Sequence, residues 1–199
     1  MIGILDIGLG NNQSVYKLLK KFGTDYEVVQ EPEQIGKIDK LIFPGVGSFS
    51  ESVKRLEVKN LKSAIKQFIL KDGHYLGICL GMQLLATTGH ENEKRDGIGA
   101  VNADVIRLFP TGRKPLPHIG WNTVLHDGKG LFENIDQDSD FYFVHSYHMK
   151  LNSSYCFHEC DYGGKFTAYV KHKNAHGVQF HPEKSQHVGQ QLIRNFLNC

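Results

Sequence analysis

The 199-residue chain lacks long apolar runs and has no strong excess of either charge. No apolar segment approaches the roughly 20 residues that a membrane-spanning helix needs. The apolar start at residues 1–5 is interrupted by Asp6 and has neither a basic beginning nor a cleavage site, so we expect no signal peptide and a cytoplasmic protein. A net charge of +2 without a lysine and arginine block predicts neither a nucleic-acid partner nor a membrane partner.

Cysteine is also scarce, and four cysteines in a chain of this length do not form a disulfide framework. Cys156 and Cys160, followed by His172 and His176, have spacings within the range of zinc ligands. Against a zinc site, the segment around the two cysteines alternates like a strand, which puts both on one face, while the histidines flank a predicted turn. We therefore expect no metal and no other cofactor, with zinc at these four residues as the open alternative.

Short apolar runs alternate with amphipathic runs through the first half of the chain. The predicted strands there cover residues 2–7, 26–29, 40–43 and 75–78. The predicted helices cover residues 14–22, 61–70 and 82–86. Strands and helices in alternation predict right-handed crossovers and a parallel sheet covered on both faces. Such a sheet binds ligands at the carboxyl ends of its strands.

The second half is rich in strand-forming residues, separated by Gly, Pro or Asp turns. The predicted strands cover residues 101–109, 122–126, 141–145, 155–160, 166–171 and 177–181. We expect them to form added antiparallel strands and hairpins, and residues 188–197 to form a closing helix. No repeat or linker interrupts the chain. The sequence therefore predicts one domain over residues 1–199, an α/β fold with a doubly wound, mixed and mainly parallel sheet.

Cys79 stands in Gly77-Ile78-Cys79-Leu80-Gly81, between a strand-like run and a helix-like run. This is the nucleophile-elbow pattern, with sulfur in place of the serine oxygen. The glycines suit a turn so tight that a Cβ at either position would collide with its neighbours. Free N–H groups at the start of the following helix would favour a thiolate. The alternative is a small apolar cysteine buried at a strand end, the commoner fate of a free cysteine.

A cysteine nucleophile needs a base, and the base needs a group that holds its tautomer. His181-Pro182-Glu183 follows a predicted strand, so the imidazole is expected at a strand end with a carboxylate two positions on that can accept its N–H. A solvated surface loop is the alternative for the tripeptide alone. His145 and His148 are weaker candidates, because neither has an acidic neighbour in sequence.

Acyl transfer also needs two N–H donors at the developing oxyanion. The backbone N–H of Leu80, directly after the nucleophile, is one candidate. The second is expected from Pro44-Gly45-Val46-Gly47, where the glycines allow a peptide plane to turn its N–H inward; an ordinary tight turn is the alternative for this loop.

These motifs resemble those of the class I, triad-type glutamine amidotransferases. The finer match is to the family of glutaminase subunits of imidazole glycerol phosphate synthase. The resemblance covers nearly the whole chain, in order, through residues 6–11, 44–49, 77–83, 118–122, 142–147 and 177–185.

The resemblance implies that Cys79 attacks the side-chain amide of L-glutamine. His181, held by Glu183, then moves the proton that lets ammonia leave, and a thioester is hydrolysed to glutamate. It further implies that the oxyanion donor of the glycine loop is the Val46 or Gly47 amide. The positions that hold the glutamine in the family correspond to Gln83, Ser146 and Tyr147.

The resemblance also implies a partner, a (β/α)₈-barrel cyclase that receives the ammonia in a heterodimer. Asn11, Trp121, Asn122 and Lys184 match positions where the family meets this cyclase. The chemistry agrees, since ammonia released into bulk water would be protonated and lost. Histidine biosynthesis is the expected pathway.

The departures from the family pattern leave the destination of the ammonia open. Ile7 replaces a common tyrosine, Ile119 a common methionine, and residues 149–150 and 155–173 are less typical. Similar departures occur in paralogues that aminate bacterial surface sugars, which is the alternative pathway. The other classes are a Cys-His-Glu peptidase and a non-enzymatic subunit. Gln83 argues against the peptidase, as do Ser146 and Tyr147, because these residues suit one small amino acid.

Overall fold

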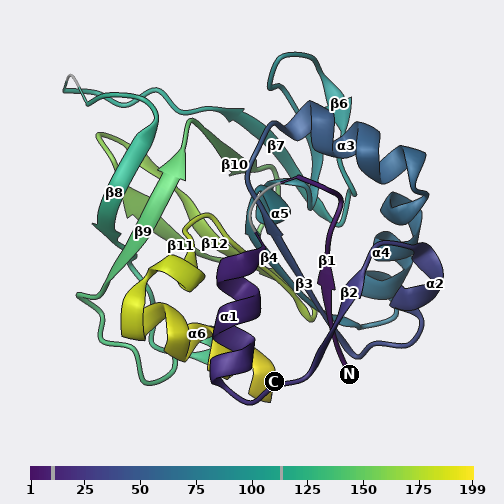
Figure 1. The fold of residues 1–199 in the computed structure, drawn as a ribbon. Helices are drawn as coiled ribbons and strands as arrows, with labels where there is room; N and C mark the ends of the chain where they lie inside the picture. The colour runs from purple at the N-terminus through teal and green to yellow at the C-terminus, as the bar shows by residue number, and fades with distance from the viewer. Residues whose placement is uncertain (10–11, 113) are drawn as a thin grey trace.

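In a computed structural model that describes residues 1–9, 12–112 and 114–199, a seven-stranded sheet forms the centre of the molecule (Figure 1). Its strand order is β11-β12-β13-β4-β3-β1-β2. The parallel strands are β1 (Ile2–Leu5), β2 (Tyr26–Val29), β3 (Lys40–Gly45), β4 (His74–Cys79) and β13 (Ala175–Val178). Two antiparallel strands extend the sheet, β12 (Lys165–His172) and β11 (Cys156–Asp161).

Two smaller sheets pack beside the main one. A four-stranded sheet has the order β10-β7-β5-β6 among the described residues. Its strands are β5 (Ala86–Gly89), β6 (Arg95–Asp96), β7 (Val101–Arg107) and β10 (Tyr147–Leu151). The third sheet is the antiparallel pair of β8 (His118–Thr123) and β9 (Asp140–His145).

Helices lie between the strands of the first half, as the predicted alternation requires, but those at residues 32–35 and 49–58 were not predicted. The helices are α1 (Gln13–Lys21), α2 (Pro32–Ile35), α3 (Phe49–Val58), α4 (Leu61–Leu70), α5 (Leu80–Gln83) and α6 (Gln186–Asn198), with the 3₁₀ turns η1 (Gly130–Phe132) and η2 (Pro182–Lys184). In the described part of the chain, no helix has the length and apolar character needed to cross a membrane.

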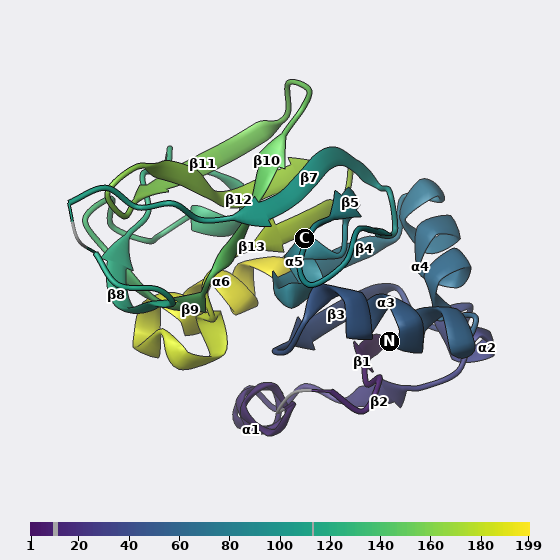
Figure 2. The same cartoon turned by 90° about the horizontal axis from the view of Figure 1, so that it is seen from above.

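The main sheet separates two apolar layers, because successive strand residues point to opposite faces. Leu41 and Tyr75 belong to one layer, with residues of α3, α4 and the four-stranded sheet. Ile42 and Leu76 belong to the other, with residues of α1, α6 and the β8–β9 pair. Figures 1 and 2 show α1 and α6 on the opposite side of the sheet from α3 and α4. This arrangement confirms the predicted mixed, mainly parallel α/β fold.

Three predicted elements are wrong in type, position or direction. The strand expected at residues 177–181 among the antiparallel strands is β13, which pairs in parallel with β4. The helix expected at residues 82–86 is the single turn α5, and Ala86 instead begins β5. All four residues of α5 are buried, so no amphipathic periodicity marks where this turn ends. The strand expected at residues 122–126 is β8, which begins at His118. Exposed Ile119 and Trp121 obscure its alternation in the sequence.

The residues of the zinc alternative do not gather. Cys156 is exposed at the start of β11, whereas Cys160 is buried, and a register shift separates the two positions. The burial of Cys156 and Cys160 therefore does not agree with the prediction that both lie on one face of the strand. His176 is buried, with Nδ1 2.9 Å from the hydroxyl of Tyr169. Within the described ranges, no group of three or more His, Cys, Asp or Glu side chains is arranged to hold a metal ion.

Candidate active site

Cys79 joins β4 to α5 with a backbone conformation of φ 52° and ψ −100°. This conformation is rare for a residue with a side chain, and strained backbone of this kind is concentrated at functional sites. The neighbouring glycines permit the turn. A Cβ on Gly77 would overlap the backbone of Gly81, and a Cβ on Gly81 would overlap the carbonyl of Phe43. The steric role expected of both glycines is therefore seen.

The helix that follows Cys79 is shorter than the sequence suggested. With only four residues, α5 aligns few peptide dipoles behind the sulfur. The N-terminus of α5 therefore stabilises a Cys79 thiolate less than expected, and more of this stabilisation must come from other groups near the sulfur.

His181 follows β13, whose parallel pairing with β4 puts Val178 beside Ile78. Nδ1 of His181 lies 2.8 Å from Oε1 of Glu183, and the two side chains are only 1% and 5% exposed. The other imidazole nitrogen, Nε2, is buried and forms no hydrogen bond to any described residue. The tripeptide thus forms the His181–Glu183 pair that the sequence suggested. Nε2 of His181 is left available for proton transfer.

The electrostatic surroundings favour a charged imidazole. Burial by itself lowers the pKa of His181, but the negative charge of Cys79 and the pairing with Glu183 outweigh it and raise the pKa to about 10. Nε2 and the sulfur do not form a hydrogen bond of good geometry, yet they lie close enough for their charges to interact. The arrangement can hold a thiolate–imidazolium pair.

A pocket of about 260 Å³ opens beside Cys79. This is slightly below the roughly 300 Å³ at which pockets for drug-sized ligands begin, which favours a small ligand. Its lining residues are Val46, Gly47, Cys79, Leu80, Gln83, Glu91, Pro117, Val144, His145, Ser146 and Tyr147. The structure thus brings the predicted oxyanion and substrate residues to one pocket with the cysteine. A larger hollow of about 580 Å³, between α3, α4 and the segment after β6, contains none of the predicted site residues.

The glycine loop after β3 reaches this pocket through the register of the sheet. Gly45 is the strand partner of Cys79, and Val46 and Gly47 follow it at the pocket wall. Gly47 has φ 129°, a conformation that favours glycine. An oxyanion donor at Val46 or Gly47 stays a prediction.

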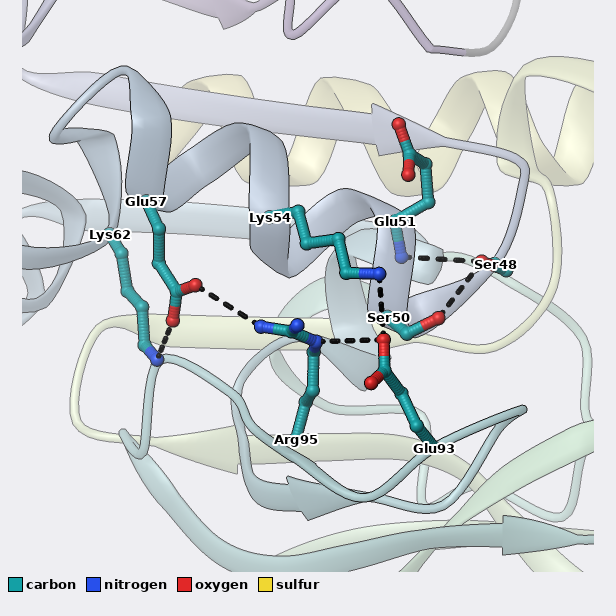
Figure 3. A network of polar contacts seen from close by, with 8 residues as sticks. All are labelled: Ser48, Ser50, Glu51, Lys54, Glu57, Lys62, Glu93 and Arg95. Atoms are coloured by element: carbon teal, nitrogen blue, oxygen red, sulfur yellow. Dashed lines mark hydrogen bonds and ion pairs between the residues drawn. The ribbon is translucent and has the colours of Figure 1, made fainter.

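Glu91 is a pocket residue that sequence reasoning missed. It lies in the loop between β5 and β6, and its Oε2 accepts a hydrogen bond of 2.7 Å from the backbone N–H of Phe49 at the start of α3. An ion pair of 2.8 Å between Lys54 and Glu93 ties the same loop to α3, within the wider network of Figure 3. Because no strand was predicted at residues 86–89, no sequence signal connected Glu91 to the site.

Gln179 is a second missed residue. Its Nε2 lies 3.5 Å from Sγ of Cys79, and its Oε1 accepts a hydrogen bond of 3.1 Å from Nε2 of Gln83. Gln83 also donates to the carbonyl of Tyr147 at 2.9 Å. The signal that could have found Gln179 is an uncharged polar residue within an otherwise apolar strand end.

The residues predicted for a partner interface divide into three cases. Trp121 is 46% exposed, with its ring 5.9 Å from that of Tyr142, and Nζ of Lys184 lies 5.8 Å from the same tyrosine ring. Asn122 instead donates to the carbonyl of Asp161 at 2.9 Å. Asn11 lies outside the described residues.

Comparison with known families identifies the class of this fold and site. The family described as "Glutamine amidotransferase class-I" matches residues 3–199. The chain belongs to the class-I glutamine amidotransferases, and it is an enzyme of that class.

Curated relatives narrow the family further. The chain is 42% identical over 200 residues to "Imidazole glycerol phosphate synthase subunit HisH 1" of Vibrio vulnificus (strain YJ016), covering 98% of this chain and 96% of the relative. It is 38% identical over 199 residues to a protein of the same description from Campylobacter jejuni (strain RM1221), with 99% of each chain covered. Within its class, the chain belongs to the HisH family.

Solved structures show the same fold at low sequence identity. One described as "Crystal structure of glutamine amidotransferase" has a TM-score of 0.77 at 18% identity, covering 99% of this chain and 97% of the other. Another, described as "Structure of PurLQS from Thermotoga maritima", has a TM-score of 0.75 at 14% identity, with 99% of this chain and 97% of the other covered.

Proposed function

We propose that this chain is the glutaminase subunit of an imidazole glycerol phosphate synthase. It hydrolyses L-glutamine to glutamate and ammonia and passes the ammonia to a (β/α)₈-barrel cyclase in a cytoplasmic heterodimer of histidine biosynthesis. The observation that supports this most directly is that strained Cys79, which lines the small pocket, lies close enough to the buried pair of His181 and Glu183 for their charges to interact. Relatives at 42% and 38% identity carry the matching description, which favours histidine biosynthesis over surface-sugar amination.

The reaction begins at the sulfur. The Cys79 thiolate attacks the side-chain carbonyl carbon of glutamine, and the carbonyl electrons move to oxygen. The backbone N–H groups of Leu80 and of Val46 or Gly47 stabilise this oxyanion. Losing one such donor typically lowers kcat by about 10²–10³-fold.

Proton transfer falls to His181. Its Nε2–H protonates the departing nitrogen, so the C–N bond breaks, ammonia leaves and a γ-glutamyl thioester remains on Cys79. The neutral Nε2 then accepts a proton from water, whose oxygen attacks the thioester and releases glutamate. Throughout, Glu183 accepts the hydrogen bond from Nδ1–H, which holds the tautomer and stabilises the imidazolium.

Substrate recognition is assigned to the remaining pocket groups. The Glu91 carboxylate is the acidic side chain of the pocket and would pair with the α-ammonium group of glutamine. Ser146 and Tyr147 would position the other end of the amino acid. The amide oxygen of Gln83 would face the substrate, since its nitrogen already makes two hydrogen bonds.

Partner docking is assigned to the surface around Trp121. This exposed aromatic residue packs on Tyr142, which also lies under the Lys184 ammonium. A large aromatic side chain beside a cation is typical of interface anchors. We expect Asn122 to lie at the same interface, and a partner contact of Asn11 rests on the family resemblance alone.

The test uses the full chain mixed with the barrel cyclase of the histidine pathway or with a surface-sugar synthase. We expect only the cyclase to raise the rate of glutamate release. In that complex, Cys79→Ala should abolish synthesis from glutamine and retain synthesis from added ammonia. If the variant still used glutamine, the assignment of the nucleophile would be wrong. Partner-independent cleavage of peptides or esters would instead support the peptidase alternative.

A further inference from the structure

A chain of hydrogen bonds leads from the sulfur of Cys79 into the protein interior. Gln179 is completely buried, and its Nε2 lies 3.5 Å from Sγ. Its Oε1 accepts from Gln83 at 3.1 Å, and Gln83 in turn donates to the carbonyl of Tyr147 at 2.9 Å. The parallel pairing of β4 with β13 brings Gln179 beside Cys79, although the two residues are 100 positions apart.

The Tyr147 carbonyl determines the direction of this chain. A carbonyl oxygen only accepts hydrogen bonds, so the Gln83 atom that contacts it is the amide nitrogen. The same nitrogen contacts Gln179, which must therefore present its oxygen to Gln83 and its nitrogen to the sulfur. Amide oxygen and nitrogen are assigned from such networks. If the Gln179 amide were rotated by half a turn, its NH₂ group would face the NH₂ group of Gln83, and two donors would be in contact.

We propose that Gln179 is a catalytic residue whose amide N–H donates a hydrogen bond to the Cys79 thiolate, held in that orientation by Gln83 and the Tyr147 carbonyl. This inference rests on the proposed function, because it concerns the same nucleophile. A donor to the charged form stabilises the thiolate over the thiol. The carbonyl of Val144, 4.0 Å from the sulfur, can accept from the thiol but cannot stabilise the thiolate.

Gln179 itself does not titrate, so its substitution isolates the hydrogen bond. The titratable groups around the sulfur are His181, with Glu183 paired to it, and the pocket residues Glu91, His145 and Tyr147. All of them remain in a Gln179 variant. A changed pH dependence of reaction at the sulfur would therefore report the loss of the amide donor.

The experiment measures the rate of alkylation of Cys79 by iodoacetamide as a function of pH, in the full chain alone and in complex with the barrel cyclase. Trypsin releases residues 72–94, in which Cys79 is the only cysteine, so mass spectrometry follows this thiol alone. The exposed Cys156 and Cys199 therefore do not interfere. The variants are Gln179→Met, which keeps the side-chain length, and Gln179→Glu, which turns an acceptor toward the sulfur.

We expect Gln179→Met to move the alkylation midpoint up by about one pH unit, which lowers the rate about tenfold at a fixed pH below the midpoint. Gln179→Glu should move it further, and the acid limb of kcat/KM for glutamine should move with it. Gln83→Met, which releases the orientation of Gln179, should give a smaller shift in the same direction. The matched control is Gln191→Met on α6, whose amide bonds Asn195 at 2.8 Å; its alkylation profile should equal that of the wild type.

A Gln179→Met protein with wild-type thermal stability and an unchanged alkylation midpoint would overturn the proposal. An equal loss of rate at every pH would also overturn it, since that pattern reports altered access. If Gln179→Met does not fold, the alkylation midpoint of Gln83→Met is measured instead, and an unchanged midpoint in that variant would overturn the proposal. The two proposals can fail separately. If the alkylation profile of Gln179→Met shifts as expected but the wild-type complex releases no glutamate, the proposed function is wrong and the hydrogen bond from Gln179 to Cys79 is still supported.

Discussion

Gly81 of α5 lies so close to Phe43 of β3 that a Cβ at position 81 would overlap the Phe43 carbonyl oxygen. The first turn after the cysteine is thus pressed against the strand that leads into the glycine loop. This close approach connects the two segments that the proposed mechanism uses at the sulfur and at the oxyanion.

Gly81→Ala is expected to destabilise the fold and to inactivate Cys79. Either α5 or β3 must move to admit the methyl group, and overpacking of this kind typically costs about 1–3 kcal/mol. Urea unfolding measures the stability, and glutamate release in the complex measures the activity. The matched control is Gly36→Ala, where the nearest atom would be 3.7 Å away and the backbone φ is −70°. Equal stabilities of the two variants would contradict the steric argument.

Glu183→Gln should lower kcat for glutamine by about 10²-fold or more, because His181 loses the carboxylate that holds its tautomer and charge. The variant also removes one of the interactions that raise the pKa of His181 to about 10. The alkaline loss of activity should therefore begin at a lower pH than in the wild type. Steady-state kinetics from pH 6 to 10 check both effects.

The control for Glu183→Gln is Glu159→Gln on β11, which breaks a surface ion pair with Lys165. We expect wild-type kinetics from this variant. An alkaline limb that stays in place in Glu183→Gln would mean that His181 is not the group that titrates there.

Glu91→Gln should raise KM for glutamine about tenfold or more with a smaller change in kcat, since a hydrogen-bonded ion pair with the α-ammonium group is lost. The new amide oxygen can still accept from the N–H of Phe49, so the loop should keep its position. The comparison is Glu93→Gln in the same loop, which loses ion pairs to Lys54 and Arg95 and does not line the pocket. If KM for glutamine rose by the same factor in both variants, Glu91 would not be a substrate-binding residue.

Stability should fall as the pH drops from about 6.5 toward 4, because several histidines are buried in neutral form. Burial lowers the pKa of His145 and of His176 to about 3 and that of His118 to about 4. The unfolded chain binds protons below pH 6.5 that the folded chain does not, so the loss spans the range between those values. His181 acts in the opposite sense. Its raised pKa contributes stability below pH 6.5 that is lost as the pH rises through about 10.

Urea midpoints measured between pH 7 and 4 test the acid effect. His176→Gln removes one buried titrating group and retains an acceptor for the hydroxyl of Tyr169. The variant should lose less stability than the wild type over this pH range. An identical pH dependence would show that His176 does not contribute to the acid sensitivity.

Several parts of the site were predictable because they are local in sequence. Gly77 and Gly81 flank Cys79 within one turn, so their steric role follows from the pentapeptide. His181 and Glu183 are two positions apart, and their 2.8 Å hydrogen bond needs no distant partner. The strands β1 to β4 were predictable as short apolar runs, whereas β13 was expected among the antiparallel strands and its parallel pairing with β4 was not predicted.

What the sequence determined by itself was the family, the mixed α/β fold and the identity of the candidate triad, because these depend on contiguous motifs and on their order. Only the tertiary structure decided which polar groups surround the sulfur. Gln179 reaches Cys79 through the pairing of β4 with β13, and Glu91 reaches the pocket from the loop after β5, a strand that was not predicted. Such contacts depend on strand register and on packing between distant segments, and a local pattern of residues does not encode them.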